Sequence, residues 1–215
     1  MLKKLGLTVV SGALVLIAGC LQKETSHTVY LAPDGSAQWV TSEVNVHSDE
    51  TDPGKRVAEE QLYIGPALLG THGVARGLAA LGPQSAVRTT VLRDERPFHV
   101  VTDARFRAID RVLERVFTEM GVKTSASLVR EGDQTTLRVS LDFSKPLVER
   151  EAPVSELFDL DHLRFVLTDG RFGAATGFDV TEGVVATLSP EWLERAEKAC
   201  DGKGTIEFTL SWTTD

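Results

Sequence analysis

Cysteine is almost absent from this 215-residue sequence, which contains only Cys20 and Cys200. If Cys20 is modified, Cys200 has no partner in the chain and no internal disulfide is possible. Cys200 follows Leu193 and Ala196 at the spacing of one face of a short helix. This spacing favours a buried, unreactive thiol. A surface thiol that pairs with another chain, or a nucleophile, is the alternative.

Basic residues are also scarce, because 23 Lys and Arg stand against 31 Asp and Glu and give a net charge of −8. Nucleic acids and anionic lipid headgroups are bound by clustered Lys and Arg, so this balance argues against both as partners. The hydrophobic content of 42% and the charged content of 25% are ordinary for a folded chain.

No apolar run is long enough to cross a bilayer as a helix, which takes roughly 20 residues. The longest, residues 5–18, is interrupted only by Thr8 and Ser11, and it follows Lys3 and Lys4. A positive start, an apolar segment of about 7–15 residues and small residues at the cleavage site describe a secretory signal peptide.

The segment Ile17-Ala18-Gly19-Cys20 resembles the lipobox of bacterial lipoproteins. The resemblance covers residues 1–21 and implies a signal peptide over residues 1–19, cleavage before Cys20, and lipid attached to the thiol and new amino group of Cys20. One acyl chain binds a membrane only marginally, whereas the three chains implied here would hold the protein there. An ordinary signal peptide with an incidental cysteine, or an anchor that is never cut, is the alternative.

The residue after the cysteine is Leu21 rather than aspartate. By the enterobacterial sorting rule this implies the outer membrane and its periplasmic face, with the inner membrane or the cell surface as alternatives. Loss of Lys3 and Lys4 with the signal peptide would move the net charge from −8 to −10. We expect residues 20–26 to form a short lipidated tether and residues 27–215 to form a single domain.

The first part of this domain is predicted to be a β-hairpin over residues 27–48, because Pro33-Asp34-Gly35-Ser36 separates two β-rich runs. In its second strand we expect Val40, Val44 and Val46 on one face and Trp39 on the other. Asp52-Pro53 then predicts a helix start. That helix is expected to end or kink at Gly65-Pro66, before a second, glycine-rich helix over residues 66–82.

The strongest helix prediction covers residues 102–121, capped by Thr102 or Asp103 and ended by Gly121. Its apolar residues recur every three or four positions: Phe106, Ile109, Leu113, Val116 and Met120. We expect this face to pack on a sheet that contains the strands over 137–143 and 206–212. Strands are further expected near 87–92, 98–101, 126–130, 162–168 and 183–188, with a helix starting at Ser189-Pro190.

Strands in hairpin-like succession, with helices interspersed but no regular βαβ alternation, predict an α+β fold. We expect a largely antiparallel sheet with about three to four helices packed on it.

The best candidate for a metal site lies where the first hairpin gives way to a helix. His47, Asp49, Glu50 and Asp52 bring nitrogen and oxygen ligands together within six residues. The spacing matches no zinc signature and lacks the glycine and final glutamate of an EF-hand loop. The end of a strand followed by the acidic start of a helix accounts equally for these residue types, because the helix dipole favours acidic residues there. His47, Asp49 and Asp52 are therefore only weak metal candidates.

Catalytic signals are weaker still. His162 lies beside Asp161 and could act as a general base, but no serine in a G-x-S-x-G context accompanies it. We therefore expect no catalytic residue, no cofactor and no metal.

The sequence favours a membrane-anchored envelope lipoprotein with a non-enzymatic domain that binds another envelope protein or scaffolds an assembly. The first alternative is a binder or carrier of an apolar ligand such as lipid, and the second is a metal-dependent hydrolase using His47 and Asp49. A large apolar cavity would favour the carrier. Histidines and carboxylates that converge on one site would favour the hydrolase. An exposed apolar patch with neither would favour the binding domain.

Overall fold

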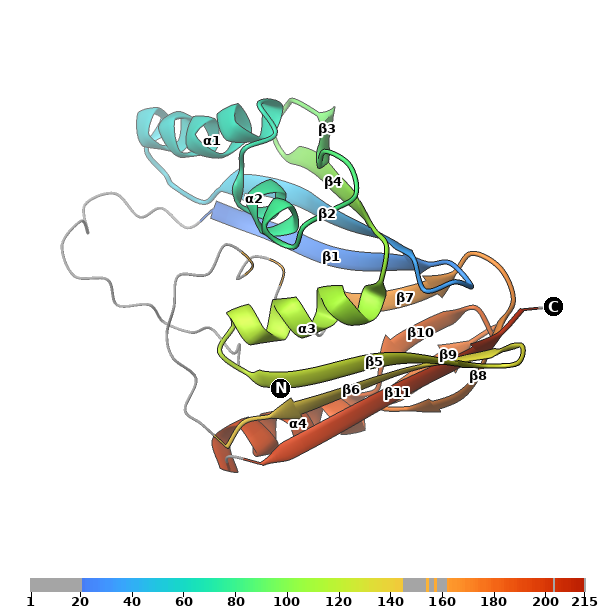
Figure 1. The fold of residues 1–215 in the computed structure, drawn as a ribbon. Coiled ribbons are helices and arrows are strands. Elements are labelled where there is room, and N and C mark those ends of the chain that lie inside the picture. The colour runs from blue at the N-terminus through green and yellow to red at the C-terminus, as the bar shows by residue number, and fades with distance from the viewer. Residues whose placement is uncertain (1–20, 145–153, 155–156, 158–161, 203, 215) are drawn as a thin grey trace.

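Two β-sheets enclose the core of the protein in a computed structural model that describes residues 21–144, 154, 157, 162–202 and 204–214 (Figure 1). The first sheet has the strand order β3-β4-β2-β1-β7-β10-β9. These strands are β1 (Leu21–Leu31), β2 (Ala37–Ser48), β3 (Arg88–Arg93), β4 (Phe98–Phe106), β7 (Leu163–Leu167), β9 (Phe178–Thr181) and β10 (Val185–Leu188).

The second sheet has the order β5-β6-β11-β8, from β5 (Lys123–Glu131), β6 (Gln134–Asp142), β11 (Thr205–Thr213) and β8 (Arg171–Thr176). The described helices are α1 (Pro53–Leu68), α2 (Gly73–Ala80), α3 (Ile109–Glu119) and α4 (Pro190–Gly202). All neighbouring strands are antiparallel except β1 and β7. The predicted α+β class is therefore confirmed, with two sheets in place of the one expected.

The first hairpin is confirmed, and Gly35 takes the left-handed φ of +84° that its turn requires. The expected tether is wrong for residues 21–26. These residues belong to β1, because their pairing with β2 continues to the register Leu21 with Ser48. The first described residue after Cys20 is therefore already part of the sheet.

The face assignment on β2 is wrong at Val46. Asn45 adopts a φ of +54°, and the pairing of β2 with both β1 and β4 shifts in register next to it. Such a bulge moves the following side chain to the other face of the strand. Val46 is therefore buried on the face of Trp39, while Val40 and Val44 lie on the other face, half-buried.

The predicted helix over 102–121 begins too early. Residues 98–106 form β4, because Phe98, Val100, Ala104 and Phe106 alternate as a buried face and β4 pairs with β2 and β3. α3 begins only at Ile109 and ends at Glu119, and Gly121 just beyond it takes the left-handed φ of +85° that stops the helix as predicted. Ile109, Leu113 and Val116 are buried as expected, whereas Phe106 comes from the strand and Met120 is a half-buried cap.

The expected break at Gly65-Pro66 is also wrong, because α1 continues through Pro66 to Leu68. Proline removes a single backbone bond, and here the loss falls within the last turn of the helix. The amide of Thr71 then donates to the carbonyl of Pro66 at 2.8 Å and closes the helix end. The second helix is correspondingly shorter than predicted.

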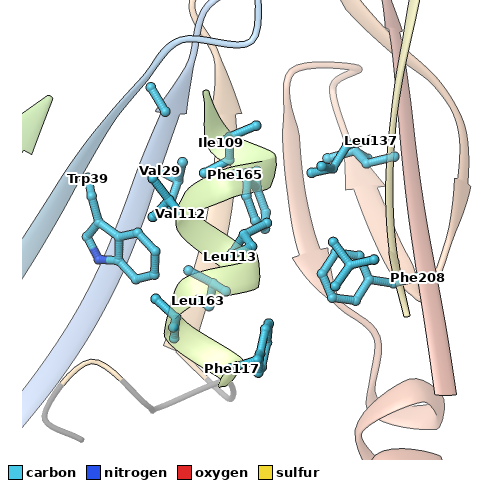
Figure 2. Close-up of a cluster of buried hydrophobic side chains, with 14 of the residues drawn as sticks. Val29, Trp39, Ile109, Val112, Leu113, Phe117, Leu137, Leu163, Phe165 and Phe208 are labelled. Carbon is cyan, nitrogen blue, oxygen red and sulfur yellow. The ribbon is translucent and has the colours of Figure 1, made fainter. Parts of the chain in front are cut away.

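The core lies between the sheets, with α3 inside it (Figure 2). Figure 2 shows side chains of the first sheet, of α3 and of the second sheet facing one another, among them Val29, Trp39, Phe165, Leu113, Leu137 and Phe208. Beside them, Phe178 contacts Phe165 and Phe208 edge to face, with ring centroids 5.6 and 5.3 Å apart. Strands β8 and β9 were not predicted, because exposed residues in both strands, and Gly173 in β8, break the apolar alternation.

Candidate functional site

The most distinctive part of the surface is α1, which covers the first sheet beyond α2, on the sheet face that also carries Trp39 (Figure 1). Asp52 caps it by accepting the amides of Gly54 and Lys55 at 2.8 and 2.9 Å, as predicted, and Pro53 occupies the first helical position. Ile64 and Ala67 hold the helix on a small apolar cluster of its own, with Val46, Phe98 and Val100 as the other buried members.

The charged residues of α1 beyond its first turn face inward. Glu60 is buried and accepts hydrogen bonds from the Ser48 amide at 3.1 Å and from the Arg96 guanidinium at 2.8 Å. The same guanidinium donates to the Ser48 carbonyl at 3.0 Å, and the Ser48 hydroxyl donates to Glu59. These bonds connect α1 to the end of β2 and to the loop before β4.

A second polar group lies deeper, around Glu43 of β2, which is only 1% exposed. Its carboxylate accepts bonds from Lys23 at 2.7 Å and from the Tyr63 hydroxyl at 3.0 Å, and it lies 3.4 Å from Nε2 of His72. Burial alone would raise the pKa of Glu43. The His72 ring and the Lys23 ammonium outweigh burial and hold this pKa at about 2. Glu43 is therefore a charged carboxylate, held by three elements at once.

Next to this group, His27 is fully buried on β1. Its Nδ1 accepts the Trp39 indole N–H at 3.4 Å and lies 3.0 Å from the Thr41 hydroxyl. Burial lowers the pKa of His27 to about 4, so the ring is neutral at pH 7. Neither Nε2 of His27 nor Nδ1 of His72 has a hydrogen-bond partner within the described part of the chain.

The opposite side of α1 is apolar and open to water. Val57, Leu62, Leu68 and Leu69, here called the α1 outer face, are all more than half exposed, and Leu62 and Leu69 reach 78%. Glu59 and Glu60 are the only charged residues from Val57 to Gly70, and both contact the inner network. A surface helix ordinarily turns its apolar stripe to the core and its charges to solvent. α1 departs from this rule, because its exposed side is apolar and its inner side carries Glu59 and Glu60 beside Ile64 and Ala67.

Each of the predicted metal candidates makes a hydrogen bond to a neighbouring group. Asp52 caps α1, Asp49 accepts the Gln22 side-chain amide at 3.1 Å, and Nδ1 of His47 donates to the Asn45 carbonyl at 2.6 Å. Within the described ranges, no three His, Cys, Asp or Glu side chains come together as a metal site would require. His162 lies near enough to His27 for their charges to interact, and Asp161 falls outside the described residues.

A cleft of about 570 Å³ lies where β8 passes into β9 and α4 begins, and it is the larger of two described hollows. Asp179, Ser189, Glu191 and Arg195 contribute to a mainly polar lining, and the cleft is open to solvent. It is not the enclosed apolar cavity expected of a lipid carrier. Cys200, on α4, is half-buried against the core, and burial raises the pKa of its thiol.

No helix among the described residues is both long enough and apolar enough to span a membrane. The sequence was compared with family models and with curated proteins, and neither comparison produced a match. Among solved structures, the chain is similar to the folded domain of LppM from Mycobacterium tuberculosis, with 15% identity over 95% of this chain and 97% of that one, and a TM-score of 0.39.

A second solved structure, the mu homology domain of Fcho1 from Danio rerio with a bound Eps15 peptide, is less similar. It shares 11% identity over 90% of this chain and 80% of that chain, with a TM-score of 0.20. Likenesses at these values carry no functional argument, so the function must be inferred from the chain itself.

Proposed function

We propose that this protein is a bacterial envelope lipoprotein, anchored through lipid on Cys20, whose domain works by contact through the α1 outer face rather than by catalysis. The lipobox-like Ile17-Ala18-Gly19-Cys20 supports the anchor. Leu21 in the position after the cysteine favours the outer membrane and its periplasmic side.

The observation that carries the contact function is the exposure of Leu62 and Leu69 on a helix whose charges point inward. Covering a leucine side chain contributes about 1.5–3 kcal/mol, so this face gains free energy when an apolar surface meets it. Large exposed apolar residues grouped on one element are typical of interaction sites. The inner network accounts for why the face stays outward in the free protein, since turning it inward would break the bonds of Glu59 and Glu60 to Ser48 and Arg96.

The non-catalytic part of the proposal rests on how the polar side chains are used. Glu43 and His72 form the one described histidine–carboxylate pair, and both side chains are almost completely buried. Tyr63 and Lys23 donate to Glu43, and the Thr102 hydroxyl lies 3.2 Å from Nε2 of His72. This arrangement fits a structural polar group, and neither of the two described hollows has Glu43 or His72 in its lining.

Thiol accessibility in isolated envelopes tests whether the α1 outer face is covered. Leu62→Cys and, as a matched control, Val129→Cys on β5 are made in full-length protein that also carries Cys200→Ser. We expect a membrane-impermeant maleimide to label Leu62→Cys poorly in envelopes and fully after detergent extraction, while Val129→Cys is labelled equally in both. Equal labelling of Leu62→Cys before and after extraction would contradict a contact at this face.

A further inference from the structure

The structure leaves no free chain between the anchor and the sheet. Leu21 is already paired with Ser48, and its side chain packs on the apolar cluster beneath α1, beside Ile64. One residue spans at most about 3.6 Å, so a lipid on Cys20 is attached within a few ångströms of the layer that carries α1. Figure 1 shows the start of β1 at the same edge of the molecule as the N-terminal end of α1.

Because the anchor lies close to α1, the membrane is nearer to the α1 outer face than any protein partner is. The outside of α1 lies about one helix diameter, roughly 10–12 Å, beyond the strand that carries the lipid. A domain held this closely meets its own membrane as an intramolecular event at high effective concentration. A protein partner would have to enter between the domain and the bilayer.

From these two relationships we propose that the α1 outer face lies in the surface of the membrane that holds the anchor, so that α1 is a second, non-covalent attachment. This inference rests on the proposed lipidation of Cys20. From Val57 to Leu69 the face runs about 18 Å along the helix. That length suits a helix lying in the plane of the interface, where apolar side chains enter by about 5–10 Å.

The charges near α1 indicate which lipid headgroups the membrane contact requires. Lys55 and Arg56 stand in the first turn, and their long stems allow the charged ends to stay at headgroup level. Asp49, Glu50 and Asp52 precede them in the same segment and outnumber these two positive charges. The attachment is therefore apolar in origin and does not depend on anionic headgroups.

The test uses acylated full-length protein carrying Cys200→Ser, labelled with an environment-sensitive fluorophore at Leu62→Cys, Leu69→Cys or Val129→Cys. Each protein is reconstituted into phosphatidylcholine vesicles that contain nitroxide-labelled lipid, and vesicle flotation confirms attachment. We expect at least two-fold quenching at positions 62 and 69 and almost none at position 129. The hairpin end of β5 lies at the opposite end of the molecule from the start of β1 in Figure 1.

Three further outcomes separate this inference from the proposed function. Protein that floats with the vesicles but shows equally weak quenching at all three positions keeps the anchor and overturns the membrane contact. The membrane contact is also overturned if position 62 is protected from maleimide in native envelopes but is not quenched in pure lipid. In that case a protein covers the α1 outer face. Protein that carries no acyl mass and does not float overturns the lipoprotein proposal and this inference with it. Leu69→Glu in the protein labelled at position 62 should reduce the quenching.

Discussion

The hydroxyl of Tyr63 donates a 3.0 Å hydrogen bond to Glu43, joining the inner side of α1 to the buried face of β2. Glu60 and Tyr63 together set the inward side of α1, and Leu62 lies away from both and is 78% exposed. The buried polar network thus fixes which side of α1 faces water, and this network is the first target for mutation.

Glu43→Ala should destabilise the fold by about 3–5 kcal/mol, as removal of one member of a buried ion pair does. The substitution leaves the Lys23 ammonium, the Tyr63 hydroxyl and His72 without their common acceptor. Glu43→Gln, which keeps an acceptor oxygen but loses the charge, should cost less. Urea denaturation measures both, and a loss below about 1 kcal/mol for Glu43→Ala would show that the network contributes little.

His27 should make the protein acid-sensitive well above the pKa of its carboxylates. Its folded pKa of about 4 lies below the unfolded value of 6.5, so between these pH values the unfolded chain binds a proton that the folded chain excludes. The stability that His27 contributes is complete above pH 6.5 and is lost as the pH falls through 4, by roughly 3 kcal/mol.

His27→Gln keeps a polar group near Thr41 and removes this titration. The free energy of unfolding, measured by denaturant at several pH values from 7 to 4, should therefore fall less steeply in the variant than in the wild type. Glu43, Lys23 and His162 interact electrostatically with His27 and are unchanged in both proteins. Identical slopes would show that the ring takes up its proton without disturbing the fold.

Leu113→Ala should cost about 2–5 kcal/mol, as large-to-small changes in a packed core do. Leu113 is 1% exposed and lies on the face of α3 that Figure 2 shows between the two sheets. Leu68→Ala, on the α1 outer face, is the matched control and should change the stability of the free protein little. Similar losses for the two variants would mean that one of the two burial assignments is wrong.

The sequence was sufficient to predict the fold wherever turn residues and apolar alternation agreed. The hairpins around Gly35 and Gly132 and the cap at Asp52 are of this kind, because the controlling interaction is local. β4 could not be predicted in full, because residues 102–106 also continue the helical spacing of α3. Pairing with β2 and β3, which is not local, decides between the two.

The candidate site was missed for a related reason. Glu43 lies on the same face of β2 as Trp39 and Thr41, at alternate positions. Its burial could therefore have been predicted from the alternation along this strand. Its partner Tyr63 comes from α1 and its partner His72 from the residue that precedes α2, and no spacing along the chain predicts their meeting. The exposure of the leucines of α1 was not predicted either, because leucines in a helix are ordinarily expected on its buried face.

His47→Ala should leave the metal content of the purified domain unchanged, because His47, Asp49 and Asp52 each bond to a nearby group rather than to one another. Asp52→Ala should lower stability modestly, and less than Leu113→Ala, through loss of two amide bonds at the start of α1. Elemental analysis of tag-free protein before and after dialysis checks the first expectation. Stoichiometric zinc or manganese that disappears in His47→Ala would instead identify a metal site.

The central claim is that Cys20 carries the lipid that holds this domain on its membrane. Intact-mass measurement of wild-type protein extracted from membranes, beside fractionation of Cys20→Ser, tests it most directly. We predict a chain that begins at Cys20 with the added mass of its acyl groups, and a variant that is released or accumulates as uncleaved precursor. A wild-type chain without acyl mass, together with a variant that fractionates identically, would contradict the account.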